Sequence, residues 1–120
     1  MIDINKIIKE YRVAAELHAS SLDKNGDFKT SNEQAEKLKK IYEILQNNPE
    51  IQLEVLGLLI KDKNPNTRGW AAAHCLGLKI LEKEAVSVLD KLSKSKDIGI
   101  ISFNAEMTLK VWRKQGYLKF

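Results

Sequence analysis

The chain has 120 residues and a formal net charge of +4 at pH 7, with 43% hydrophobic and 30% charged residues. These fractions are close to globular averages and exclude a disordered tail, a collagen-like chain and a disulfide scaffold. Residues 1–60 carry a net charge of −2 and residues 61–120 carry +6. The basic half therefore suits an acidic protein or a phosphate-bearing partner, and the acidic half suits a basic partner.

Two long amphipathic helices are predicted in the first part of the chain. Apolar residues recur every three or four positions over residues 4–22, which indicates a helix with one buried stripe. The polar, glycine-containing residues 23–27 predict a turn. The second helix is expected over residues 31–46, with Thr30 or Ser31 as its N-cap.

Four shorter helices are predicted after Pro49. Residues 50–60 are apolar on nearly every side, so we expect this helix to be the most deeply buried. Residues 67–78 contain small side chains that allow close packing against neighbouring helices. The last two helices are expected over residues 82–92 and 99–113.

Paired in order, these helices form three hairpins, at about residues 2–47, 49–79 and 81–115, within one domain of residues 1–120. The unit of about 40 residues matches the period of HEAT repeats, and three units are about the minimum for a stable stack. Residues 62–77 resemble a HEAT repeat: Asn-Pro, then arginine, consecutive alanines and Leu-Gly. A fainter copy aligns Leu109 with Leu76. The resemblance implies an all-α fold, an α-α superhelix of the HEAT-like or ARM type.

Three stretches, residues 11–18, 68–74 and 103–112, resemble a family of small bacterial HEAT-like domains of unknown function. Members are often encoded beside toxins. The resemblance therefore implies an immunity protein, a non-enzymatic binder that neutralises a cognate toxin by occluding its active site. A helical stack of this kind also fits a nucleic-acid-binding domain that uses the basic C-terminal half, or a structural adaptor.

No pattern in the sequence predicts catalysis, and we expect no enzyme activity, no cofactor and no metal. Two histidines and one cysteine do not supply the three or four ligands of a zinc site. We expect His18 to be a core residue. Cys75 is expected to be a small buried apolar residue rather than the partner of His74, because adjacent helical residues point about 100° apart.

Seven residues are predicted to contact a partner protein. Arginine and tryptophan are enriched at binding hot spots, which selects Arg68 and Trp70, with His74 one turn further on. Charged residues complete the set: Glu33, Glu36, Lys110 and Arg113. The acidic pair would mimic the phosphates of a nuclease substrate, and the basic pair would meet an acidic target.

A cytoplasmic location is expected. The single cysteine cannot form an intrachain disulfide, which fits a reducing compartment. Residues 1–6 show no apolar signal segment. No apolar run reaches the roughly 20 residues of a membrane span, so we expect no membrane partner.

Overall fold

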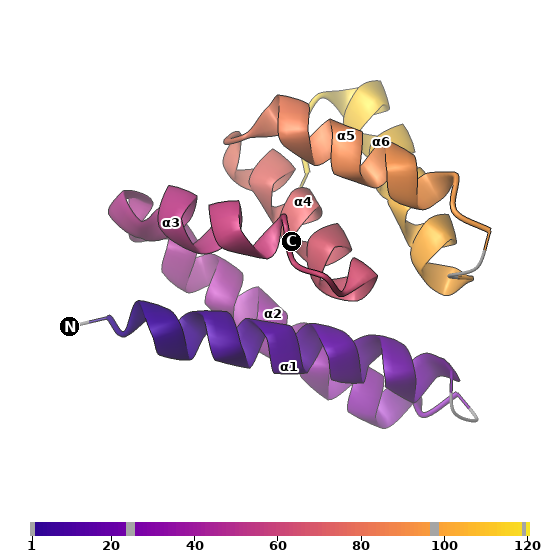
Figure 1. Ribbon diagram of the computed structural model, residues 1–120, viewed down its shortest axis with the longest axis horizontal. Helices are drawn as coiled ribbons and strands as arrows, with labels where there is room; N and C mark the ends of the chain where they lie inside the picture. Colours follow the sequence, from indigo (N-terminus) through magenta and orange to yellow (C-terminus); the bar gives the residue numbers. More distant parts are fainter. Residues whose placement is uncertain (1, 24–25, 97–98, 119) are drawn as a thin grey trace.

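The computed structural model describes residues 2–23, 26–96, 99–118 and 120, which form six α-helices and no strand (Figure 1). The helices are α1 (Ile4–Asp23), α2 (Phe28–Gln46), α3 (Pro49–Leu59), α4 (Pro65–Leu78), α5 (Glu82–Ser93) and α6 (Ile100–Gln115). The prediction of an all-α chain with six helices is confirmed, and the predicted ends differ by at most three residues. Of the predicted turn at 23–27, residues 24 and 25 lie outside the described part.

The prediction of Thr30 or Ser31 as the N-cap of α2 is wrong. The helix begins at Phe28, and the side chain of Asp27 accepts a hydrogen bond of 3.1 Å from the backbone N–H of Thr30. Hydrogen bonding to Thr30, first through its side chain and then through its backbone N–H, lowers the pKa of Asp27. An aspartate N-cap satisfies a free N–H group and places negative charge at the positive end of the helix dipole, so the helix extends one turn earlier.

Proline opens α3 and α4, where its missing N–H has no helical partner in any case. The side chain of Asn64 caps α4 by accepting a hydrogen bond of 2.8 Å from the N–H of Asn66. At the other end of the chain, Gly116 closes α6 with φ of 79°, a left-handed conformation that glycine adopts without strain. These local signals set the lengths of the helices.

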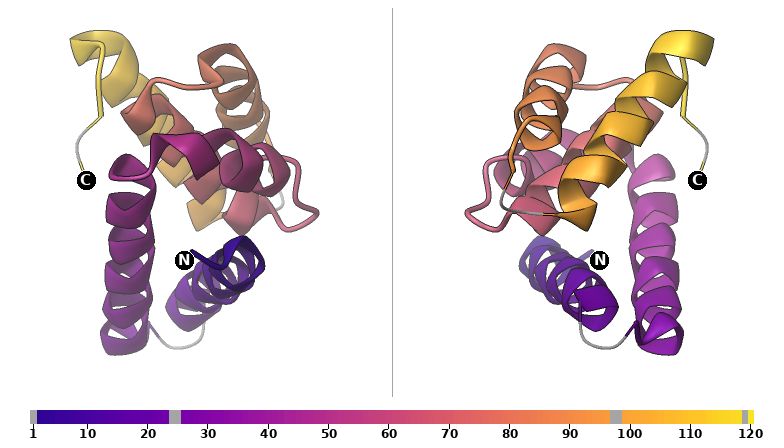
Figure 2. Two further views of the ribbon diagram at one scale, coloured as in Figure 1. Left: turned by 90° about the vertical axis from the view of Figure 1, so that its left-hand side faces the viewer. Right: turned by 90° about the vertical axis from the view of Figure 1, so that its right-hand side faces the viewer.

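The helices α1 and α2 form an antiparallel hairpin on one side of the molecule, and α4, α5 and α6 pack together on the other (Figures 1 and 2). The most extensive packing joins α1 to α2, α4 to α5 and α5 to α6, whereas α3 makes smaller contacts with α1, α2 and α4. Helical hairpins are consistent with this arrangement. The three-hairpin division and the superhelix remain predictions.

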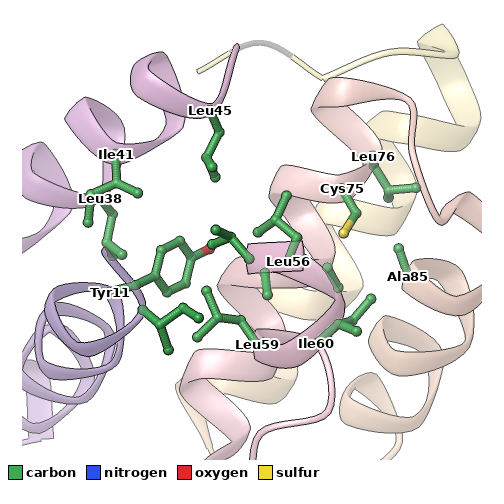
Figure 3. Close-up of a cluster of buried hydrophobic side chains, with 14 of the residues drawn as sticks. Tyr11, Leu38, Ile41, Leu45, Leu56, Leu59, Ile60, Cys75, Leu76 and Ala85 are labelled. Carbon is green, nitrogen blue, oxygen red and sulfur yellow. The ribbon is translucent and has the colours of Figure 1, made fainter. Parts of the chain in front are cut away.

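The core lies where α1, α3 and α4 meet. Figure 3 shows Tyr11, Leu56, Leu59 and Cys75 gathered there from these three helices. All of these side chains are fully buried. Leu56 and Leu59 lie on the inner side of α3, which fixes the orientation of that helix.

The prediction that residues 50–60 form the most buried helix is wrong, because α4 holds that position. Every residue from 71 to 76 is buried, since α4 contacts α1, α3, α5 and α6. On α3, by contrast, Leu53 is 60% exposed and Leu58 is 56% exposed. The apolar character of α3 on all sides therefore does not correspond to burial on all sides, because no helix covers its outer side.

Candidate functional site

The seven residues predicted to contact a partner lie on three helices that do not form one surface. Arg68, Trp70 and His74 are on α4, Glu33 and Glu36 on α2, and Lys110 and Arg113 on α6. No substantial packing joins α2 to α6. The structure thus divides the predicted site into separate groups, each of which has its own surroundings.

His74 lies at the centre of a cluster of aromatic side chains. Its Nδ1 atom shares a hydrogen bond of 2.7 Å with the hydroxyl of Tyr11. The rings of Tyr42 and Phe120 lie 4.8 and 4.9 Å from the His74 ring, and the Trp70 ring lies 5.8 Å away. The imidazole is therefore enclosed by side chains from α1, α2 and α4 and by the last residue of the chain.

The prediction that His74 contacts a partner is wrong in this structure, because its side chain is fully buried. Burial lowers the pKa of His74 to about 3, so the imidazole is neutral at pH 7. Its Nε2 atom has no hydrogen-bond partner among the described residues. The His74 side chain therefore packs between the helices and is not exposed on a surface.

Trp70 is partly buried and faces the interior between α4 and α6. Its ring meets the ring of His18 edge-on at 5.1 Å. It also lines a hollow of about 250 Å³, together with Ala73, Leu89, Ala105 and Phe120. This volume is below the range of about 300–1,000 Å³ typical of small-molecule sites, and no charged residue lines it. Trp70 is therefore mainly a packing residue, and His18 is a half-buried member of the same cluster.

Arg68 connects the start of α4 to the preceding loop. Its Nη1 atom donates hydrogen bonds of 2.9 Å to the backbone carbonyls of Asp62 and Lys63. The same loop is held to α1 by an ion pair of 2.7 Å between Arg12 and Asp62. The guanidinium of Arg68 is thus already engaged within the chain, and its main contribution is to order residues 61–66.

Replacing Arg68 by alanine is expected to lower the free energy of unfolding by about 1–2 kcal/mol. The two carbonyls lose a charged donor, and such hydrogen bonds are worth more than neutral ones. The matched control is Arg113→Ala, because Arg113 is exposed on α6 and makes no ion pair with any described carboxylate. Urea denaturation of both variants measures the difference, and equal stability of the two would contradict this role for Arg68.

Glu33 and Glu36 lie on the exposed side of α2, but they do not form an acidic patch. The same shallow hollow is lined by Lys29, Lys37 and Lys40. A carboxylate array that imitates a nucleic-acid backbone needs negative potential over an extended surface. The neighbouring lysines offset that potential, so the surroundings of this pair do not favour phosphate mimicry.

The exposed side of α6 carries a continuous apolar surface. Ile100, Phe103, Met107 and Val111 recur every three or four residues, and all four are exposed. We call these four residues the α6 outer face. In the right-hand view of Figure 2, α6 runs along the outside with no other helix in front of it. By helical spacing, Lys110 borders this face and Arg113 lies on the adjoining side.

A second candidate surface, missed in the sequence, is a groove between α1 and α2. It has a volume of about 610 Å³ and is lined by four lysines, Lys6 and Lys9 on α1 and Lys37 and Lys40 on α2. The net negative charge of residues 1–60 conceals this local cluster. The signal that could have revealed it is the pair of Lys-x-x-Lys spacings, which places two lysines on one face of each helix.

The single cysteine of the chain lies in the interior of the structure. Burial raises the pKa of Cys75 to about 12, so its thiol is protonated and the prediction of a buried apolar role is confirmed. No three His, Cys, Asp or Glu side chains gather in the described ranges as a metal site needs. Over the same part of the chain, none of the helices has the length and apolar character to span a bilayer.

Comparison with known proteins identifies no relative of this chain. No protein-family model, no curated protein and no solved structure matches the chain.

Proposed function

We propose that the chain is a non-enzymatic, protein-binding domain, and that the α6 outer face is its contact surface. The observation that carries this proposal is the exposure of four large apolar side chains on one side of one helix. Phe103 is 56% exposed at the middle of this surface. A contiguous exposed apolar surface bordered by charge is typical of protein interaction sites.

The border of the α6 outer face also suits a protein partner. By helical spacing, Lys110 borders it and Lys114 lies at its C-terminal end, and the Nζ atom of Lys110 lies 3.4 Å from Glu106 on the same helix. Exposed charges at the rim of an apolar surface guide association and set specificity more than they add affinity. We therefore assign the binding energy to the apolar residues and the choice of an acidic partner to the lysines.

The proposal is tested by capture of a partner with three forms of the tagged protein: wild type, Phe103→Ser and Phe28→Ser. Phe28 is the matched control, since it is 67% exposed at the start of α2 and outside the α6 outer face. From a nuclease-treated lysate of the source organism, we expect one stoichiometric protein on the wild type and Phe28→Ser, and its loss on Phe103→Ser. Equal capture by the two variants would contradict the proposal.

A more specific form of this function rests on the resemblance to small HEAT-like domains. In that form, the three hairpins stack as an α-α superhelix, and the protein is a cytoplasmic immunity protein that occludes a toxin's active site. The test is growth: expression of the captured partner alone should arrest growth, and co-expression of the wild-type chain, but not Phe103→Ser, should restore it. Growth without the chain would favour a structural adaptor.

Nucleic-acid binding is the second candidate, supported by the cations near the end of α6. Single-strand binders combine such charges with aromatic residues on which bases stack. Here Trp112 packs against the core, whereas Tyr117 is 50% exposed and Phe120, which packs against Tyr42 and His74, is 40% exposed. Retention on DNA that falls steeply with salt, and that survives Phe103→Ser, would favour this candidate.

A further inference from the structure

The groove between α1 and α2 combines a basic rim with an apolar floor. Lys6, Lys9, Lys37 and Lys40 line it, with Glu10 as the single acidic residue among the lining side chains. The Lys6 Nζ atom lies 4.0 Å from Glu10. The other three lysines have no ion-pair partner among the described carboxylates. The lining residues of the groove therefore carry net positive charge, which Glu33 and Glu36, beside Lys37 and Lys40 in the adjoining hollow, reduce but do not cancel.

The floor of the groove is aliphatic and partly exposed. Val13 is 47% exposed and Ile44 is 39% exposed, although both lie on helices whose opposite sides form the core. Their exposed surface lies between the lysines of the two helices. An apolar strip with cationic borders fits a ligand with apolar residues on one side and negative charges at its edges.

Gln34 adds a polar group that is incomplete in the free chain. It lines the groove and is 5% exposed, and its buried Oε1 atom accepts no hydrogen bond from any described group. A buried acceptor without a donor costs free energy. Because this oxygen is itself buried, the groove presents its lysines and its aliphatic floor to a ligand.

We propose that this groove binds an acidic amphipathic helix of a partner protein. The apolar side of that helix would pack on Val13 and Ile44, and its carboxylates would pair with the flanking lysines. The site is separate from the α6 outer face and stands independently of it. It lies on the other helical group, so the proposal adds a second recognition surface and names the chemistry of its ligand.

Two other occupants fit the groove less well. A nucleic acid would find phosphate partners, but no aromatic side chain lines the groove for its bases to stack on. A second copy of this chain related by two-fold symmetry would place the same lysines opposite one another. Like charges at close range oppose such an interface. An acidic helix satisfies both the charge and the aliphatic floor.

The test uses a fluorescent synthetic helix of about 18 residues, or five turns, with leucine on one side and glutamate on the other. Two reference probes are the same helix with lysine in place of glutamate and a single-stranded oligonucleotide of matched charge. The groove variant is Lys9→Glu with Lys37→Glu. The matched control is Lys83→Glu with Lys91→Glu, which reverses two exposed charges on α5.

We expect fluorescence anisotropy to show tight binding of the acidic helix by the wild type and the control, and about tenfold or greater weakening by the groove variant. The basic helix and the oligonucleotide should bind the wild type more weakly than the acidic helix. Equal weakening by both double variants would mean general charge attraction and would overturn the proposal. Preferred binding of the oligonucleotide, or no binding of the acidic helix, would overturn it as well.

A second pair of variants tests the apolar floor. Val13→Asp places a negative charge between the lysines and should weaken binding of the acidic helix to a similar degree. Leu53→Asp, at an exposed leucine of α3, is its control and should leave binding unchanged. Circular dichroism of each variant is the control that it is folded. Unchanged binding by Val13→Asp would show that the floor makes no contact and would contradict the proposed position of the helix.

Discussion

Replacing Leu56 by alanine is expected to lower the free energy of unfolding by about 3 kcal/mol. The side chain is fully buried where α1, α3 and α4 meet, next to Tyr11 and Leu59 (Figure 3). Its truncation removes apolar contacts and leaves a cavity that the surrounding helices fill only in part. For a domain of this size, where total stability is about 5–15 kcal/mol, such a loss is large.

The matched control lies on the same helix. Leu53→Ala makes the same chemical change at a side chain that is 60% exposed, and we expect it to change stability by less than about 0.5 kcal/mol. Guanidinium denaturation at pH 7 measures both variants. Similar losses at the two positions would contradict the orientation of α3, because they would require its outer side to be covered.

Acidification is expected to destabilise the protein through His74. The imidazole is neutral and buried in the folded state with a pKa of about 3, whereas an unfolded histidine has a pKa of about 6.5. Below pH 6.5 the unfolded chain binds a proton that the folded chain excludes, so stability falls as pH falls towards 3. Within this window the free energy of unfolding falls by up to about 1.4 kcal/mol for each pH unit. The total loss between pH 6.5 and pH 4.5 is therefore about 2–3 kcal/mol.

The variant His74→Phe isolates this effect, because phenylalanine keeps an aromatic ring in the cluster but cannot titrate. It loses the hydrogen bond to Tyr11, so its stability at pH 7 is expected to be lower by about 1–2 kcal/mol. The decisive quantity is the change from pH 7 to pH 4.5 within each protein, measured by urea denaturation. That change should be about 2–3 kcal/mol smaller in the variant, and equal changes would show that His74 is protonated in the folded state.

The helices could be predicted because their signals are local. The spacing of apolar residues predicts where the helices run, and Pro49 and Pro65 predict where α3 and α4 begin. The small residues of α4 predict the close packing of that helix. The N-cap of α2 differs from the prediction because the apolar pattern places the start of the helix only to within a few residues, and Asp27, a better capping residue than Thr30, lies one turn earlier. The burial of α3 was misjudged because the number of helices that cover a given helix depends on the tertiary arrangement.

The candidate surfaces could be predicted only in part, for the same reason. Trp70 and His74 were predicted to contact a partner because aromatic side chains are common at binding hot spots. Buried packing uses the same residue types, and in the structure both residues belong to the aromatic cluster. Lys110 borders an exposed apolar surface, but helical spacing in the sequence does not show which apolar residues of α6 are left uncovered. The groove lysines come from two helices that only the hairpin brings together.

The measurement that tests the central claim most directly is calorimetric titration of the purified captured partner into the wild type, Phe103→Ser and Phe28→Ser. We predict a 1:1 complex, a dissociation constant about tenfold or more weaker for Phe103→Ser, and an unchanged constant for Phe28→Ser. Equal dissociation constants for all three proteins would contradict the assignment of the α6 outer face as the surface through which this chain binds its partner.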